Sequence, residues 1–149
     1  MRKKIDIVYL NDKCALKLGS EGAFAFDVFA NIEEEIVLKP GEVCSVPLGF
    51  SVDTGERTIG MFLLMRSGLA GNYGLMLMNS VGLIDSDYRG ECIARIWNTG
   101  SMGKTYVIKP LERMGQVAFM EGVDVELNVV EKLSDTNRGT GGFGSTGRV

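Results

Sequence analysis

Histidine is absent from this sequence of 149 residues. Its absence excludes Ser-His-Asp and Cys-His nucleophilic catalysis as they are usually built, and it excludes every site that needs an imidazole ligand. Hydrolysis by this chain would have to rest on carboxylates, arginines, backbone amides or a metal held by oxygen atoms. Phosphate chemistry assisted by Mg²⁺ is compatible with such a composition.

Cysteine and net positive charge are also scarce. The three cysteines, Cys14, Cys44 and Cys92, are far apart and form no CxxC pair, which predicts reduced thiols in a cytoplasmic protein. The net charge of −3 argues against a general affinity for nucleic acid. The basic start at Met1 is followed by an apolar run, Ile5–Tyr9, that is too short for a signal peptide or a membrane segment.

The sequence has no long stretch with the apolar spacing of an amphipathic helix. Short runs of period-two character recur instead, separated by turn residues such as Pro40-Gly41 and Thr99-Gly100. This spacing predicts one all-β domain, a sandwich, barrel or jelly roll. The expected strands are Ile5–Tyr9, Ala23–Ala30, Glu35–Leu38, Val43–Val52, Gly60–Met65, Leu75–Met78, Cys92–Asn98, Tyr106–Ile108, Met114–Phe119 and Val125–Val130.

The last residues differ from the rest of the chain. Ser134–Val149 holds five glycines and a single large apolar side chain, Phe143, so it cannot form a packed strand. By composition alone it is typical of a disordered polar tail. We therefore expect a β domain over residues 1–133 and a flexible glycine-rich C-terminal arm over residues 134–149.

Two segments have the residue types of a phosphate site. Arg66, Ser67 and Gly68 directly follow an apolar strand, where a guanidinium, a hydroxyl and exposed amides could face one anion. A plain strand-to-turn junction with a solvated arginine explains them equally well. Arg113 and Gln116 begin another strand and could also donate to phosphate oxygens, although they also suit a soluble edge strand.

Carboxylates stand out at two places. Asp85 and Asp87 lie two residues apart in Gly82–Gly90, and a carboxylate beside a bound phosphate could deprotonate a water molecule. Taken alone, the segment is more typical of a polar hairpin with aspartates in its turn. Asp27 is a charge within an apolar strand, and such a residue is usually paired or functional when buried.

Together, five segments resemble the five motifs of the trimeric dUTP diphosphatase family, in the same order and spacing. They are AFDVFA around Asp27, RSGLA at Arg66–Ala70, N-x-x-GLIDSDYRGE at Asn79–Glu91, RMGQ at Arg113–Gln116 and RGTGGFGSTG at Arg138–Gly147. The resemblance implies a jelly-roll β-barrel that hydrolyses dUTP to dUMP and diphosphate. Such an activity limits uracil incorporation into DNA and supplies dUMP for dTMP synthesis.

The resemblance also implies a role for each matching residue. Asp85 would activate the water that attacks the α-phosphorus in line, and Tyr88 would pack on the deoxyribose and exclude a ribose. The uracil edge would be read by Asn79, by the backbone around Leu83 and Ile84, and by the strand at Ile93. The phosphates would be held by Arg66, Ser67, Gly68 and Gln116.

Further implications concern the metal, the arm and the assembly. Asp27 would reach Mg²⁺ through water. The arm would close over the site, with contributions from Arg138, Phe143, Gly144, Ser145 and Thr146. The family forms homotrimers whose active sites take residues from more than one subunit, so a homotrimer is expected here.

Two alternatives remain open. A dCTP deaminase shares this fold, but that family has a second serine and a later arginine where this chain has Gly68 and Gly71. A nucleotide-responsive binding protein would use the same pocket to control a regulatory protein partner, although the presence of Asp85 argues against a loss of catalysis.

Overall fold

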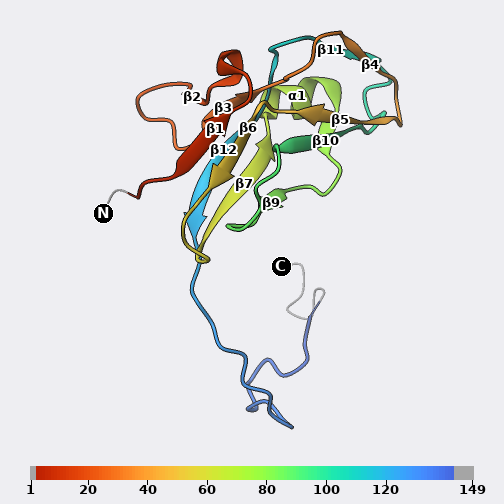
Figure 1. Ribbon diagram of the computed structural model, residues 1–149. Coiled ribbons are helices and arrows are strands. Elements are labelled where there is room, and N and C mark those ends of the chain that lie inside the picture. Colours follow the sequence, from red (N-terminus) through yellow and green to blue (C-terminus); the bar gives the residue numbers. More distant parts are fainter. Residues whose placement is uncertain (1–2, 143–149) are drawn as a thin grey trace.

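The computed structural model describes residues 3–142, which form a β-barrel with one short α-helix and an extended C-terminal segment (Figure 1). The elements are β1 (Asp6–Tyr9), the 3-10 turn η1 (Asp12–Cys14), β2 (Lys17–Leu18), β3 (Phe26–Phe29), β4 (Ile36–Leu38), β5 (Val43–Pro47), β6 (Phe50–Asp53), β7 (Ile59–Met65), α1 (Ser67–Tyr73), β8 (Leu75–Leu77), β9 (Gly82–Ile84), β10 (Ile93–Asn98), β11 (Tyr106–Ile108) and β12 (Arg113–Glu121).

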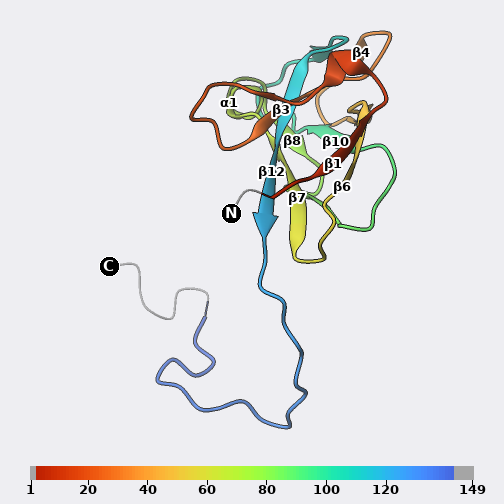
Figure 2. The same cartoon turned by 60° about the vertical axis from the view of Figure 1, so that its left-hand side comes forward.

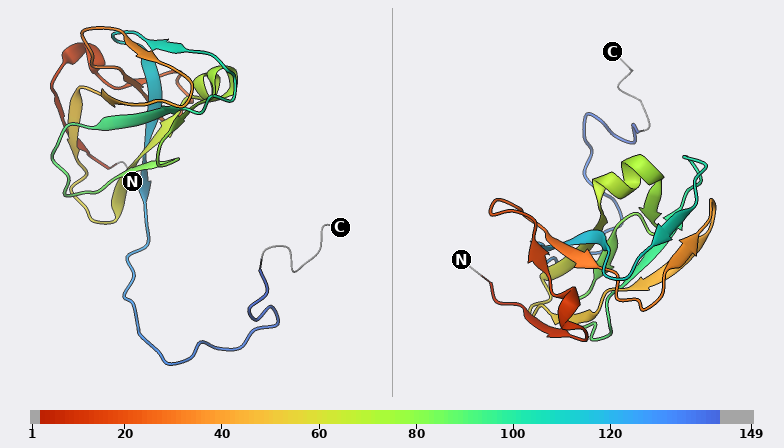
Figure 3. Two further views of the ribbon diagram at one scale, coloured as in Figure 1. Left: turned by 90° about the vertical axis from the view of Figure 1, so that its right-hand side faces the viewer. Right: turned by 90° about the horizontal axis from the view of Figure 1, so that it is seen from above.

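The strands form four small sheets in which every pairing is antiparallel. The largest has the order β2-β3-β12-β7-β9, and the others are β5-β10-β8, β1-β6 and β11-β4. Figure 3 shows how these sheets curve around a common interior. β12, the longest strand, lies between β3 and β7 and runs down the barrel (Figure 2). The all-β prediction is therefore confirmed.

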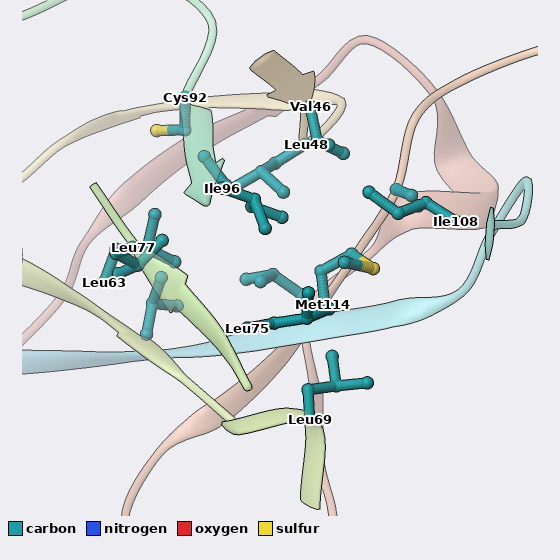
Figure 4. Close-up of a cluster of buried hydrophobic side chains, with 14 of the residues drawn as sticks. Val46, Leu48, Leu63, Leu69, Leu75, Leu77, Cys92, Ile96, Ile108 and Met114 are labelled. Atoms are coloured by element: carbon teal, nitrogen blue, oxygen red, sulfur yellow. The ribbon is translucent and has the colours of Figure 1, made fainter. Parts of the chain in front are cut away.

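Aliphatic side chains from most of the strands fill the interior (Figure 4). In β7, Met61 and Leu63 are buried while Phe62 and Leu64 between them are only partly covered. This period-two pattern is the one that the sequence predicted, because successive side chains of a strand point to opposite faces. The barrel thereby turns one face of β7 and β12 outward, and the candidate site residue Gln116 lies on β12.

The predicted strand Val43–Val52 is two strands, β5 and β6, which are separated at Gly49. Gly49 has a φ of +76°, and a Cβ atom there would lie 2.9 Å from Cβ of Cys14. A continuous strand is impossible at such a kink, because a left-handed backbone breaks the extended ladder. The periodicity of the flanking residues conceals this break in the sequence.

The predicted strand Val125–Val130 is wrong for this chain. β12 ends at Glu121, and from Gly122 the chain leaves the barrel as an extended segment without strand pairing (Figures 1 and 3). The side chains of its apolar positions are exposed: Val123 by 87%, Leu127 by 87% and Val129 by 95%. The segment has the composition of a strand but finds no neighbour within residues 3–142.

The helix α1 was not expected from the sequence. It has only seven residues and ends at Gly74, whose φ of +68° allows its N–H group to reach the carbonyl oxygen of Ala70. Apolar periodicity cannot reveal a helix this short, because it presents only one buried side chain, Leu69. No helix within residues 3–142 is long and apolar enough to cross a membrane.

Candidate active site

A pocket of about 240 Å³ lies at the β9–β10 loop, which connects two strands of different sheets. It contains all six residues that were expected to bind the base and sugar or to activate water, namely Asn79, Leu83, Ile84, Asp85, Tyr88 and Ile93. The structure thus brings these side chains together. Leu77, Cys92 and Arg95 also line the pocket and were not expected there.

The turn after β9 separates the two aspartates. The N–H of Tyr88 donates to the carbonyl oxygen of Asp85 at 3.2 Å, so the chain bends directly after that residue. Asp85 lines both the base pocket and a second hollow beside β9, whereas Asp87 lines only the second hollow. The side chain of Asp85 is exposed and takes part in none of the ion pairs found within residues 3–142. It is thus available to accept a proton.

Tyr88 folds back over its own turn. Its hydroxyl donates to the carbonyl oxygen of Glu91 at 3.1 Å. A Cβ atom at Gly90 would overlap the Tyr88 hydroxyl, so only glycine leaves room for the ring in this position. Glu91 in turn accepts bonds from the backbone of Gly49 at 2.8 Å and from Asn31 at 3.1 Å. These hydrogen bonds join the end of the β9–β10 loop to the turn between β5 and β6.

The candidate phosphate residues lie elsewhere on the same sheet. Arg66 precedes α1, and Ser67 and Gly68, both exposed, form its first residues. The guanidinium of Arg66 donates to the carbonyl oxygen of Arg113 at 3.3 Å. Because β7 pairs with β12, this junction lies beside Gln116, whose strand partner in β7 is Leu64. These donors therefore share one end of β7.

Asp27 is buried at 4% exposure and is paired, as a charge within an apolar strand should be. Its carboxylate accepts from Arg113 at 3.2 Å and from Gln116 at 3.3 Å. A β-bulge between Arg113 and Gly115 interrupts the β12–β3 register beside this pair. Gly115 is required there, because a Cβ atom would lie 2.7 Å from the carbonyl oxygen of Leu64.

A magnesium ion could meet the carboxylate of Asp27 only through water, because this buried group already accepts bonds from Arg113 and Gln116. No group of three potential metal-ligating side chains occurs within the described residues. Mg²⁺ commonly binds through one or two carboxylates together with substrate phosphates, so a single carboxylate beside phosphate donors is sufficient. Asp27 fits this pattern.

Within one chain, Asp85 and the phosphate residues lie at opposite ends of β7. Ile84 pairs with Met61 near the start of β7, and Arg66 follows its last residue. Asp85 is thus level with Gly60, six positions from Arg66, which corresponds to roughly 20 Å of extended strand. A general base must lie within hydrogen-bond reach of its water. One protomer therefore does not bring Asp85 and the phosphate donors together.

The expected residues of the arm are not brought to either half. Arg138 is exposed and donates to the carbonyl oxygen of Gly141 at 2.9 Å, in the segment that extends away from the barrel (Figure 1). Phe143, Gly144, Ser145 and Thr146 lie outside the described residues. Their roles stay predictions.

Comparison with known proteins identifies the family. The dUTPase family model matches residues 11–147. The deoxyuridine 5'-triphosphate nucleotidohydrolase of Desulfitobacterium hafniense is 39% identical over 147 residues, which is 97% of this chain and 96% of that protein. The chain belongs to the dUTPase family.

Solved dUTPase structures share the fold. The G164S mutant of the dUTPase of Staphylococcus bacteriophage 80alpha, determined with dUpNHpp, has a TM-score of 0.85 at 22% identity and covers 98% of this chain and 99% of its own. The dUTPase of the Staphylococcus aureus phage phi11, described with a structural Mg(II) ion, has a TM-score of 0.75 at 20% identity and covers 87% of this chain and 98% of its own. The predicted dUTPase-like jelly roll is thereby confirmed.

Sequence reasoning missed several residues of the dUTPase site. Arg113 was considered only as a phosphate donor, and its ion pair with Asp27 was not foreseen. The buried charge of Asp27 could have indicated such a partner, but not which arginine supplies it. Arg95, which lines the base pocket and donates to Ser45 at 3.3 Å, had no signal beyond its place in an alternating strand.

Proposed function

We propose that the chain is a dUTP diphosphatase that hydrolyses dUTP to dUMP and diphosphate. Membership of the dUTPase family supports the reaction. The main observation in this chain that supports the reaction is the pocket at the β9–β10 loop, which Asp85, Tyr88 and Asn79 line together. This combination supplies a base, a wall for the sugar and a polar group for the uracil edge.

Asp85 is the proposed general base. Its exposed carboxylate would take a proton from the water that attacks the α-phosphorus, while diphosphate leaves in line. With no histidine in the chain, a carboxylate is the natural group for this proton transfer. The α-phosphorus gains one oxygen from water and loses its bridging oxygen to diphosphate, so the reaction is a simple hydrolysis.

The base pocket would select uracil and deoxyribose. Asn79 and the backbone at Leu83 and Ile84 line it together with Ile93. A backbone-lined slot can reject cytosine, because mismatched buried donors and acceptors stay unpaired. Tyr88, fixed over Gly90, would occupy the space that a ribose 2'-hydroxyl needs.

Arg66, Ser67, Gly68 and Gln116 would bind the phosphates. The carboxylate of Asp27 holds Gln116 and Arg113 from below, which supports a preorganised set of donors. Asp27 would also hold Mg²⁺ through water, and the ion would neutralise charge on the triphosphate. The structural Mg(II) of the phi11 phage enzyme supports a metal in this family, and its use by this chain is part of the proposal.

The separation of Asp85 from the phosphate donors in one chain supports a homotrimer with shared active sites. If the β9–β10 loop of one protomer met the end of β7 beside Arg66 in a second protomer, one site would contain both a base and phosphate donors. The exposed apolar side chains of Val123, Leu127 and Val129 support association, since such a strand-like segment needs a partner to cover it. The arm residues Arg138, Phe143, Gly144, Ser145 and Thr146 would then close over bound nucleotide.

The three cysteines are free thiols, which supports a reducing, cytoplasmic location. A regulatory protein partner stays a prediction, and a pull-down with and without a nonhydrolysable dUTP analogue addresses it.

Diphosphate release from dUTP, dTTP, dCTP and UTP, measured with and without Mg²⁺, tests the proposed function. Hydrolysis confined to dUTP and enhanced by Mg²⁺ is expected. Ammonia release from dCTP would instead indicate a deaminase, and equal hydrolysis of UTP would contradict the role of Tyr88.

A further inference from the structure

Arg89 lies in the turn that carries Asp85 and Tyr88, and the proposed chemistry gives it no task. Its guanidinium nevertheless makes the densest set of contacts in the turn. One terminal nitrogen donates to the carbonyl oxygen of Ser86 at 2.7 Å and to that of Tyr88 at 3.3 Å. The other forms an ion pair with the carboxylate of Asp53 at 2.7 Å. The side chain thus joins the inside of the turn to a distant strand.

Asp53 is a fixed anchor for this arginine. It is the last residue of β6 and is paired in register with Asp6 of β1. Its second carboxylate oxygen accepts from the N–H of Gly55 at 2.8 Å, so both oxygens are engaged. The neighbouring Val52 is buried in the core. An arginine bound to Asp53 is therefore bound to the body of the barrel.

Apart from the two hydrogen bonds that Tyr88 donates to Asp85 and Glu91, the turn has few other restraints. Asp85, Asp87, Tyr88 and Arg89 are exposed, so packing contributes little to their position. The carbonyl groups that Arg89 holds belong to Ser86, which follows Asp85 directly, and to Tyr88 itself. A shift of the guanidinium would therefore move the backbone that directly follows the candidate base. Small displacements of a reacting group reduce a rate far more than they reduce stability.

An exposed ion pair alone would not support this conclusion. Arg89 and Asp53 have side-chain exposures of 55% and 41%, and such pairs contribute little to folding stability. The two carbonyl contacts are what distinguish this pair. A planar guanidinium can bind a carboxylate and neighbouring carbonyl groups at once, whereas an ammonium is a single point donor.

We propose that Arg89 and Asp53 form a clasp that positions the Asp85–Tyr88 turn for hydrolysis. Both are positioning residues, because they act through the turn. The proposal rests on the proposed function, since it assigns the clasp to the same reaction. It predicts a loss of kcat without a matching loss of stability.

The test uses Arg89→Gln, Asp53→Asn and the double variant of the full chain, in a diphosphate-release assay with saturating dUTP. Asp53→Asn retains an oxygen to accept from Gly55 and removes only the charge. Each single variant should lower kcat about fivefold to tenfold, the scale of a lost charge-assisted hydrogen bond. The double variant should be no slower than Arg89→Gln, because both changes open the same clasp.

Glu56→Gln is the matched control. Glu56 lies in the β6–β7 turn, three residues after Asp53. It pairs with Lys3 at 2.8 Å and has no ion pair with Arg89. Its kcat should equal that of the wild type. Arg89→Lys should keep the melting temperature of the wild type but not its kcat, since an ammonium cannot make all three contacts.

Several outcomes would overturn the clasp. They are wild-type kcat in Arg89→Gln, additive losses in the double variant, or an equal loss in Glu56→Gln. If Arg89→Gln does not fold, Asp53→Asn decides, and wild-type kcat in that variant rejects the proposal. Failure of the proposed function is distinguishable, because the wild type itself would then release no diphosphate from dUTP.

Discussion

At the scale of single residues, the proposed catalysis depends on the exposed carboxylate of Asp85 and on the ring of Tyr88, for which Gly90 leaves room. Asp85 is free of ion pairs within residues 3–142, while Asp27, the other site carboxylate, is buried and doubly hydrogen-bonded. The two aspartates therefore differ in what they can do. In the proposed mechanism Asp27 orients the phosphate donors, and Asp85 accepts the proton.

Asp85→Asn should bind dUTP as the wild type does but hydrolyse it about 10²- to 10⁴-fold more slowly, the usual contribution of a general base. The amide is nearly the same size and cannot accept the proton. Single-turnover hydrolysis and calorimetric binding of a nonhydrolysable analogue measure the two effects separately. Asp87→Asn serves as the control in the same turn. Hydrolysis by Asp85→Asn at the wild-type rate would show that the base is another group.

Cys92 should react slowly with alkylating reagents at pH 8. Burial raises the pKa of its thiol to about 12, and the charge of Glu91 adds to the shift. The thiol stays protonated in the folded state between pH 9 and 12 but ionises in the unfolded state, so its contribution to stability is lost as pH rises through this window. Mass spectrometry after timed iodoacetamide treatment should show Cys92 among the last sites modified. Rapid modification in the folded protein would contradict its burial.

At the scale of elements, the sequence predicts strands well where they alternate and poorly where a neighbour decides. Period-two burial in β7 is visible because the alternating residues Met61 and Leu63 are large and apolar. The break at Gly49 is not visible, because it depends on contact with Cys14, which is distant in sequence. Val125–Val130 has the composition of a strand, yet pairing needs an edge that the chain itself does not offer.

The same limit applies to the site. The motif from Asn79 to Glu91 is one continuous stretch of sequence, and all of the site residues expected in it line one pocket. The contacts of Asp27 with Arg113 join β3 to β12 across 86 residues of sequence, so no local pattern reveals them. The clasp between Arg89 and Asp53 is another long-range contact that only the fold discloses.

A chain that ends at Lys132 should keep its melting temperature but lose most of its dUTP hydrolysis. Residues 133–140 are exposed and pack against nothing in the barrel, so their removal costs little stability. Closure over the nucleotide would be lost, and with it the exclusion of water. Calorimetry and the diphosphate assay check the two parts, and full activity of the shortened chain would show that the arm is only a polar tail.

At the scale of the whole molecule, β7 separates the base from the phosphate donors. Its length places Asp85 and Arg66 at opposite ends of one strand, so the proposed site would need a second copy of the chain. A closed symmetric assembly would complete every site at once, because each protomer contributes its β9–β10 loop to one site and its phosphate donors to another. The central claim is that the active site is built between protomers, with Asp85 as the base.

Complementation between two inactive variants tests this claim most directly. Asp85→Asn lacks the base and Arg66→Gln lacks a phosphate donor, and each alone should have little activity. An equal mixture of the two variants is denatured and refolded so that the protomers assemble at random. About a quarter of the wild-type rate should return, because about one site in four then combines an intact Asp85 with an intact Arg66. A mixture no more active than the two variants refolded separately would contradict the account.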